Sequence, residues 1–144
     1  SCVLRIETAH GNALLTGDIG HLIEAKLLRE DPASLRNEVV LVPHHGSAGS
    51  SGEDFVAATG ARLALVSSGA SNRFGHPRMP VVQRWCEAGA EVVDTARAGA
   101  IRVWLRAGGL QMQERRASRP RLWDAARRRN GAAGLCYAPE MQRP

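Results

Sequence analysis

Two adjacent histidines, His44 and His45, directly follow an apolar run at residues 39–42. This pattern predicts a buried strand that ends at a glycine-containing turn carrying two imidazoles. Imidazole is the commonest protein ligand for metals such as zinc, and a carboxylate often completes a catalytic site. Asp18 ends the earlier run 13–18 in the same way. Because strand ends in an open α/β sheet meet at one edge, we expect Asp18 to lie near the histidines.

A third polar cluster, residues 67–77, follows an apolar run at 62–66 and contains His76. One aspartate with one or two histidines suits Zn²⁺ or Mn²⁺ and leaves coordination positions open for water. Such a metal lowers the pKa of bound water towards about 7, so that hydroxide can attack an ester. The candidate site residues at these strand ends are therefore Asp18, His45 and His76, with Asp18, His44 and His45 as the candidate metal ligands.

Each candidate also has a simpler structural explanation. Asp18 could cap the helix expected from residue 20, and His45 could be a turn residue with no ligand role. His44 is better suited to orienting another ligand than to binding directly. The candidate substrate-binding residues are Ser47, Asn72 and Arg73. Ser47 has no Gly-x-Ser-x-Gly setting, which favours a turn role, and the other two could contact phosphate or only shape their loop.

The elements that must position these residues follow from the apolar patterns. We expect strands at residues 2–7, 12–16, 38–42, 62–66, 91–93 and 100–105, and helices at 20–29, 50–58 and 80–88. The first two strands are predicted to form a hairpin, and a serine hydroxyl before residue 53 is expected to cap the second helix. The third helix should place Val81, Val82 and Trp85 inward. Alternating strands and helices predict an α/β layered fold, or α+β layered in the broader sense.

The formal net charge of +5 comes from one end of the chain. Residues 1–106 carry 11 basic and 11 acidic side chains, whereas residues 107–144 carry 8 arginines and 3 acids. We therefore expect a domain boundary after residue 106, followed by an Arg-rich, largely irregular tail with a possible short helix at 122–129. The basic run 115–129 could neutralise DNA phosphates or could simply be solvated, and Trp123 alone is not a stacking platform.

The three cysteines, Cys2, Cys86 and Cys136, have no Cys-x-x-Cys spacing. This argues against a zinc knuckle and against a disulfide framework, and Cys86 is expected to be a small core residue. Neither a membrane-spanning stretch nor a signal peptide is visible. The chain opens directly on a predicted strand, which suggests a piece of a longer protein.

Three motifs in order, LLTGD at 14–18, PHHGS at 43–47 and NRFGHP at 72–77, resemble the metallo-β-lactamase-like domain of the competence DNA-internalisation family ComEC. The strand that begins at Ala98-Gly99-Ala100-Ile101 also resembles the end of that domain. The resemblance covers residues 1–106 and implies the C-terminal half of an αββα metallohydrolase sandwich. It implies that Asp18 bridges two metals, that His45 binds the second metal with His44 as the alternative, and that His76 contacts phosphate or the leaving group.

The upstream His-x-His/Asp-x-Asp-His metal cluster of that superfamily is missing from this sequence. We therefore expect this chain to bind Zn²⁺ or Mn²⁺ weakly or not at all and to be inactive by itself, while a longer parent would be a metal-dependent phosphodiesterase. Since a half-domain can expose an apolar face, a homodimer is possible.

The resemblance implies a part of a DNA-uptake channel for natural transformation. Its partners would be incoming DNA, as a single strand or a duplex, and the remainder of the membrane channel protein. The domain itself would be soluble and lie on the extracytoplasmic side of the inner membrane. The alternatives are a non-catalytic DNA-binding or scaffolding module of the channel, and an unrelated metallohydrolase that shares only the scaffold.

Overall fold

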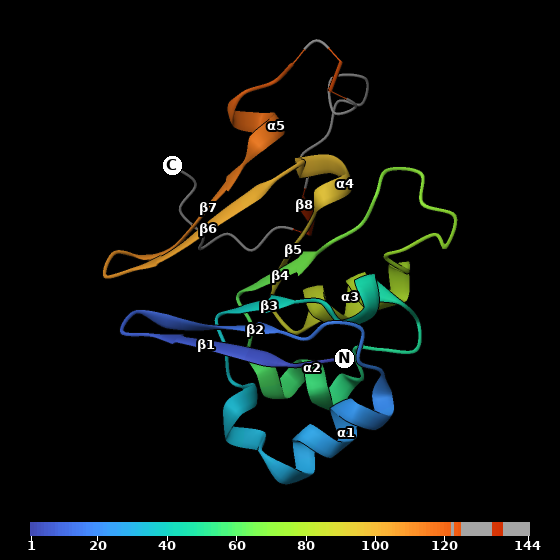
Figure 1. The fold of residues 1–144 in the computed structure, drawn as a ribbon, viewed down its shortest axis with the longest axis vertical. Helices are drawn as coiled ribbons and strands as arrows, with labels where there is room; N and C mark the ends of the chain where they lie inside the picture. The colour runs from blue at the N-terminus through green and yellow to red at the C-terminus, as the bar shows by residue number, and fades with distance from the viewer. Residues whose placement is uncertain (122, 125–133, 137–144) are drawn as a thin grey trace.

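The computed structural model describes residues 1–121, 123–124 and 134–136 (Figure 1). The strands are β1 (Leu4–Thr8), β2 (Gly11–Leu15), β3 (Val39–Leu41), β4 (Leu63–Val66), β5 (Glu91–Asp94), β6 (Ile101–Arg106), β7 (Gly109–Glu114) and β8 (Gly134–Cys136). The α-helices are α1 (His21–Glu30), α2 (Glu53–Thr59), α3 (Met79–Glu87), α4 (Thr95–Ala98) and α5 (Arg115–Ser118), with 3₁₀ turns at Pro32–Leu35 and Pro43–Gly46. Within the described ranges, no helix is both long and apolar enough to cross a membrane.

One six-stranded sheet in the order β1-β2-β3-β4-β5-β8 organises the chain. The strands from β2 to β5 pair in parallel, and β1 and β8 are antiparallel at the two edges. The expected hairpin is confirmed, with Leu4 opposite Leu15 and Thr8 opposite Gly11. The predicted mixture of strands and helices in layers is confirmed as well.

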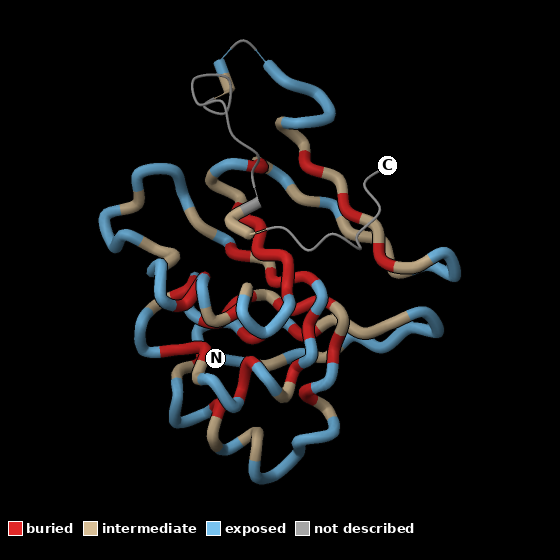
Figure 2. The backbone as a smooth tube through the Cα atoms, turned by 180° about the vertical axis from the view of Figure 1, so that it is seen from behind, coloured by how far each residue is buried: buried red, intermediate tan, exposed pale blue. Residues whose placement is uncertain are grey.

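Apolar side chains cover both faces of this sheet. Val40 and its neighbours face α1, α2 and α3, where Phe55 and Trp85 are fully buried. Val39, one residue earlier, faces the other way and packs with Leu110 and Met112 of the β6–β7 hairpin. Figure 1 shows the three helices on one side of the sheet and the hairpin on the other, and Figure 2 shows the buried residues concentrated along the central strands. The alternation of strand side chains therefore builds two cores with the sheet between them.

The chain after residue 106 is not largely irregular in its described part, contrary to the sequence-based expectation. Residues 109–114 form β7, which pairs with β6 from Ile101 opposite Glu114 to Arg106 opposite Gly109. Leu110 and Met112 alternate with glutamines, and this period-two pattern buries the apolar side of β7. The boundary expected after residue 106 therefore falls inside a hairpin. The short helix expected at 122–129 lies outside the described residues except for positions 123 and 124.

The expectation about cysteines was wrong in one respect. Cys86 on α3 and Cys136 on β8 form a disulfide across 50 residues of sequence, while Cys2 is free and exposed. An odd total of cysteines does not exclude one pair, and nothing in local spacing reveals a bond between elements that meet only in the fold. The disulfide joins the helical layer to the edge strand beside β5.

The prediction that a serine hydroxyl caps the N-terminus of α2 is wrong. Its N-cap residue is Gly52, and Ser50 donates its hydroxyl to the carbonyl oxygens of Pro43 and Ser47 instead. The buried carboxylate of Glu24, from α1, accepts the backbone N–H groups of Ser51 at 2.6 Å and Gly52 at 2.9 Å. A negative charge at a helix N-terminus is favourable, so Glu24 satisfies these donors and joins the two helices.

Candidate active site

The parallel strands β2, β3 and β4 end at the same edge of the sheet, and the loops after them carry all the candidate residues. Two hydrogen bonds hold the first two loops together. The buried hydroxyl of Thr16 donates to the carbonyl oxygen of Leu41 at 2.6 Å, and the backbone N–H of His44 donates to the carbonyl oxygen of Gly17 at 3.0 Å. The expected convergence of these strand ends on one edge is confirmed.

Asp18 and His45 face each other across this edge. The Oδ1 atom of Asp18 lies 3.4 Å from Nε2 of His45, and both side chains are about half exposed, at 56% and 51%. Nδ1 of His45 lies 2.7 Å from the carbonyl oxygen of Ser67, which can only accept a hydrogen bond. The imidazole therefore donates through Nδ1 and presents Nε2 to the carboxylate. A backbone carbonyl behind a histidine is the usual arrangement that orients a metal ligand.

The alternative role for Asp18, capping of the following helix, is not observed. The N-cap residue of α1 is Gly20 rather than Asp18, and no side-chain hydrogen bond is made from this N-cap position. The carboxylate of Asp18 is instead free to act together with His45. A cation between a carboxylate oxygen and an imidazole nitrogen matches the chemistry of Zn²⁺ and Mn²⁺.

These two donors make an incomplete metal site. In the described part of the chain, no group of three or more histidine, cysteine, aspartate or glutamate side chains is placed to hold a metal ion. His44, an expected ligand, lies close to His76, with ring centroids 6.3 Å apart in an edge-to-face arrangement. The remaining coordination positions would have to be filled by water, by substrate or by groups outside this chain.

His76 sits in a row of stacked groups along the loop after β4. The ring of Phe74 stacks on His76 at 5.8 Å, and the guanidinium group of Arg73 lies 4.8 Å from the Phe74 centroid. The side chain of Asn72 accepts the backbone N–H of His76 at 2.9 Å and donates to its carbonyl oxygen at 2.7 Å. Asn72 therefore shapes the loop and fixes His76, whereas Arg73 could reach an anion from its place on the same loop.

Ser47 serves the turn. Its backbone N–H donates to the carbonyl oxygen of His44 at 3.0 Å, and its hydroxyl accepts the backbone N–H of Gly49 at 3.3 Å. This is the turn role that the absence of a nucleophile motif favours.

The backbone of the two histidines is in the left-handed region, which the sequence could not reveal. The φ angle is +50° at His44 and +56° at His45, and +81° at Gly46. Residues with a Cβ are disfavoured there, and such strain of about 1–3 kcal/mol per residue concentrates at functional sites. Two consecutive imidazoles in this conformation indicate that the turn is specialised to present them.

The environment of His76 lowers its pKa below the usual value of 6.5. Partial burial is the main cause, and positive charge on Arg78, His44 and His45 acts in the same direction. All these effects disfavour the imidazolium form. At neutral pH, His76 is therefore neutral and can both accept and donate a hydrogen bond.

This shift predicts a loss of stability in mild acid. The unfolded chain binds a proton at His76 more tightly than the folded chain does, so the free energy of unfolding falls as the pH drops below about 6.5 and continues to fall until the folded-state pKa is passed. His76→Gln should remove this part of the pH dependence, and Arg78→Gln should weaken it. Urea denaturation between about pH 7 and pH 5 measures the effect. A His76→Gln variant with the full acid sensitivity of the parent chain would contradict the prediction.

Comparison with known proteins relates this chain to one segment of larger proteins. No family model and no solved structure matches it. It is 34% identical over 116 residues to Competence protein ComA of Neisseria gonorrhoeae, covering 81% of this chain and 17% of that protein. It is 35% identical over 101 residues to ComE operon protein 3 of Bacillus subtilis, covering 70% and 13%, and 30% identical over 116 residues to the uncharacterized protein YcaI of Escherichia coli, covering 81% and 15%. The chain thus spans less than a fifth of the length of each of these relatives.

Proposed function

We propose that this chain acts in the uptake of DNA for transformation, because its similarity to the two competence proteins supports membership of the ComEC family. Since the chain matches only a small part of those proteins, its partner would be the remainder of a membrane channel protein. Incoming DNA would be the molecule on which the channel acts.

We further propose that the sheet edge takes part in metal-dependent hydrolysis of a phosphodiester. The observation that carries this proposal is the 3.4 Å approach of Asp18 and His45, with His45 oriented by the carbonyl oxygen of Ser67. Zn²⁺ or Mn²⁺ held by these two side chains would supply a water with a lowered pKa. His76, neutral and fixed by Asn72, would donate a hydrogen bond to a phosphate oxygen or to the leaving oxygen.

We propose that this chain forms the C-terminal half of an αββα sandwich. The arrangement of the layers in the structure supports this proposal. One helical layer covers the six-stranded sheet, and a second, two-stranded sheet of β6 and β7 packs on its other face. A sandwich of this kind has two sheets between two helical layers. The upstream part of such a domain would supply the ligands that Asp18 and His45 lack.

The disulfide supports a location outside the cytoplasm. Disulfides persist in oxidising compartments such as the periplasm and the cell surface and are rare in the cytoplasm. The bond between Cys86 and Cys136 ties α3 to the edge of the main sheet and so belongs to the fold itself. We therefore propose that this domain faces the extracytoplasmic side of the membrane.

A second candidate function is a non-catalytic DNA-binding or scaffolding module of the same channel. The observation that favours it is the small number of ligands, since the described residues bring only two metal-binding side chains together at the sheet edge. This module would bind DNA without cleaving it.

The test is hydrolysis of labelled single-stranded DNA with Mn²⁺, by the chain alone and by the longer protein from which it comes. In whichever form cleaves DNA, Asp18→Asn and His45→Gln should each lower the rate by about 100-fold or more, because each removes a ligand. Asp31→Asn and His10→Gln are matched controls at exposed positions away from the site. Cleavage unaffected by the first pair would contradict the hydrolytic proposal, and DNA binding without any cleavage by either form would favour the module.

A further inference from the structure

The orientation of His45 is set by a backbone carbonyl. The oxygen of Ser67 lies 2.7 Å from Nδ1 of the imidazole, and Ser67 is an exposed loop residue directly after β4. Because a carbonyl oxygen can only accept a hydrogen bond, its position decides which ring nitrogen of His45 carries the proton. Whatever fixes this carbonyl therefore also fixes the nitrogen that His45 turns toward Asp18.

The hydroxyl of Thr95 binds the same peptide group from the other side. Its Oγ1 atom accepts the backbone N–H of Ser68 at 2.9 Å and donates to the carbonyl oxygen of Ser68 at 2.8 Å. The N–H of Ser68 and the C=O of Ser67 belong to one planar peptide group, and in its trans form they point in opposite directions. A continuous series of hydrogen bonds therefore runs from Thr95 through this peptide group to Nδ1 of His45.

Thr95 is itself held in place by the short helix that it begins. It is the first residue of α4, directly after β5. The carboxylate of Asp94 accepts the backbone N–H of Arg97 at 2.7 Å and caps the start of this helix. The guanidinium group of Arg116, on α5, donates to the carbonyl oxygen of Ala96 at 2.6 Å, a group that so short a helix leaves without an internal partner. The Thr95 hydroxyl is thus a fixed point to which the loop after β4 is attached.

We propose that Thr95 is a positioning residue of the candidate active site. Its hydroxyl acts through the peptide group between Ser67 and Ser68. It keeps the proton of His45 on Nδ1 and leaves Nε2 to face Asp18 and a metal ion. An acceptor behind a metal-binding imidazole orients the ring and raises its basicity, and hydrogen bonds in series strengthen one another. The consequence for catalysis rests on the proposed hydrolytic function, whereas the effect on the His45 tautomer does not.

A purely structural role for the same hydroxyl makes a different prediction. A threonine that only satisfied the backbone of Ser68 would add to stability without any effect on the His45 ring. The loss of a hydrogen bond lowers stability in either case, so a stability measurement does not separate the two roles. The tautomer of His45 does separate them, because it reports the position of the Ser67 carbonyl.

The experiment records long-range proton–nitrogen correlation spectra of the full chain with isotope-labelled histidine, without metal and at about pH 8.5, where imidazole is neutral. The His45 signals are assigned by their loss in His45→Gln. In the unsubstituted chain, Nδ1 should carry the proton. Thr95→Val and Thr95→Ala should each lower the ratio of the Nδ1–H form to the Nε2–H form about tenfold, which is the effect of one hydrogen bond. Thr95→Ser keeps the hydroxyl and should stay within about twofold of the unsubstituted ratio.

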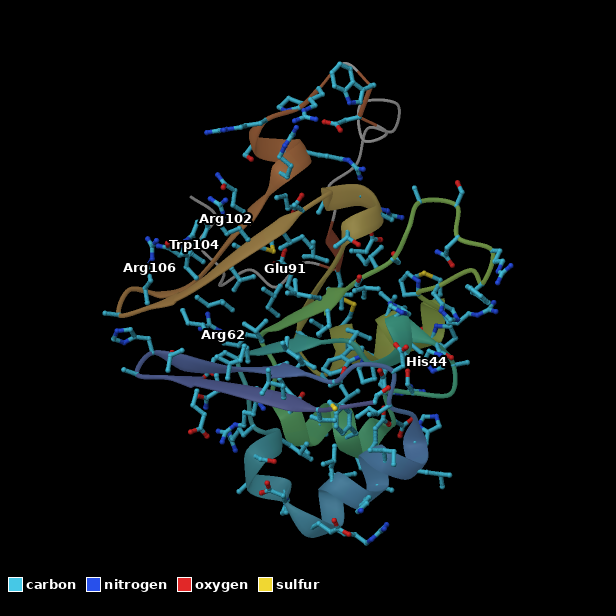
Figure 3. All side chains as sticks on the ribbon, in the orientation of Figure 1. His44, Arg62, Glu91, Arg102, Trp104 and Arg106 are labelled. Carbon is cyan, nitrogen blue, oxygen red and sulfur yellow. A yellow bond between two sulfur atoms is a disulfide. The ribbon has the colours of Figure 1, made fainter. Side chains whose placement is uncertain are left out.

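Thr59→Val is the matched control. The buried hydroxyl of Thr59 also donates to one backbone carbonyl and accepts one backbone N–H, at 2.7 Å and 3.4 Å. Thr59 ends α2, and Figure 3 shows Arg62, which follows it before β4, on the opposite side of the molecule from His44. Thr59→Val should therefore lower stability but leave the His45 tautomer unchanged.

A second measurement tests the consequence for catalysis. In whichever form of the protein cleaves DNA, Thr95→Val should raise the Mn²⁺ concentration needed for half-maximal cleavage by about tenfold while the KM for DNA stays the same. Thr95→Ser should restore the original Mn²⁺ requirement.

Three results would overturn the inference. The first is an unchanged tautomer ratio in both Thr95→Val and Thr95→Ala, the second is an equal change in Thr59→Val, and the third is an unchanged Mn²⁺ requirement in Thr95→Val. The expected tautomer shift in a protein that cleaves no DNA in any form would instead support the positioning role of Thr95 and count against the proposed hydrolysis.

Discussion

Replacing Cys86 and Cys136 together by alanine is expected to lower the free energy of unfolding by about 4 kcal/mol. The disulfide closes a loop of 50 residues, and a loop of that length restricts the unfolded chain by an amount of this size. The bond also fixes β8, a strand of three residues, against β5 and α3. Since a typical domain is stable by about 5–15 kcal/mol, this loss is a large fraction of the total.

Urea denaturation in the absence of reductant measures this effect. Cys2→Ala is the matched control, because Cys2 is exposed and unpaired and its removal should leave the midpoint unchanged. The double variant should also be insensitive to dithiothreitol, whereas the parent chain should lose the same stability when reductant is added. Equal midpoints for the double variant and Cys2→Ala would show that the bond contributes nothing to the folded state.

The sequence was a good guide to what depends on local pattern. The strand before His44, the hairpin that precedes Asp18 and the helix that buries Trp85 all follow from the spacing of apolar residues. The meeting of Asp18 and His45 could also be predicted, because parallel strands place their carboxyl ends at one edge. The local pattern was sufficient for these features since each depends on a few neighbouring residues or on a general rule of sheet topology.

The features that the sequence did not reveal depend on contacts between distant segments. The disulfide partner of Cys86 comes from a strand that returns to the sheet edge, and Glu24 reaches the N-terminus of a helix 28 residues further along. The carbonyl oxygen of Ser67, which orients His45, has no sequence signature at all. By contrast, β7 could have been found, because its alternation of Leu110 and Met112 with glutamines is a strand pattern that the local arginine excess obscured.

Gly46 is the residue that joins the histidine turn to the loop carrying His76. A Cβ atom at this position would lie 2.6 Å from Cβ and 3.0 Å from Cα of Pro77, closer than atoms can pack. The carbonyl oxygen of Gly46 also accepts the backbone N–H of Arg78 at 2.9 Å. This close contact between the turn that carries His45 and the loop that carries His76 therefore requires glycine at position 46.

Gly46→Ala is accordingly expected to lower the free energy of unfolding by about 3 kcal/mol, through backbone strain at φ +81° and the collision with Pro77. Gly89→Ala is a matched control, since Gly89 has a similar φ of +90° but a Cβ atom added there would meet nothing within 4 Å. It should lose only about 1–2 kcal/mol, which is the strain alone. The difference between the two variants in urea denaturation then isolates the contact between the loops.

Because a shift of about 1 Å in a reacting group can cost 100-fold in rate, Gly46→Ala should also lower any DNA hydrolysis by about that factor, whereas Gly89→Ala should not. Equal stability losses in the two variants would show that the histidine turn and the His76 loop are not held together at Gly46.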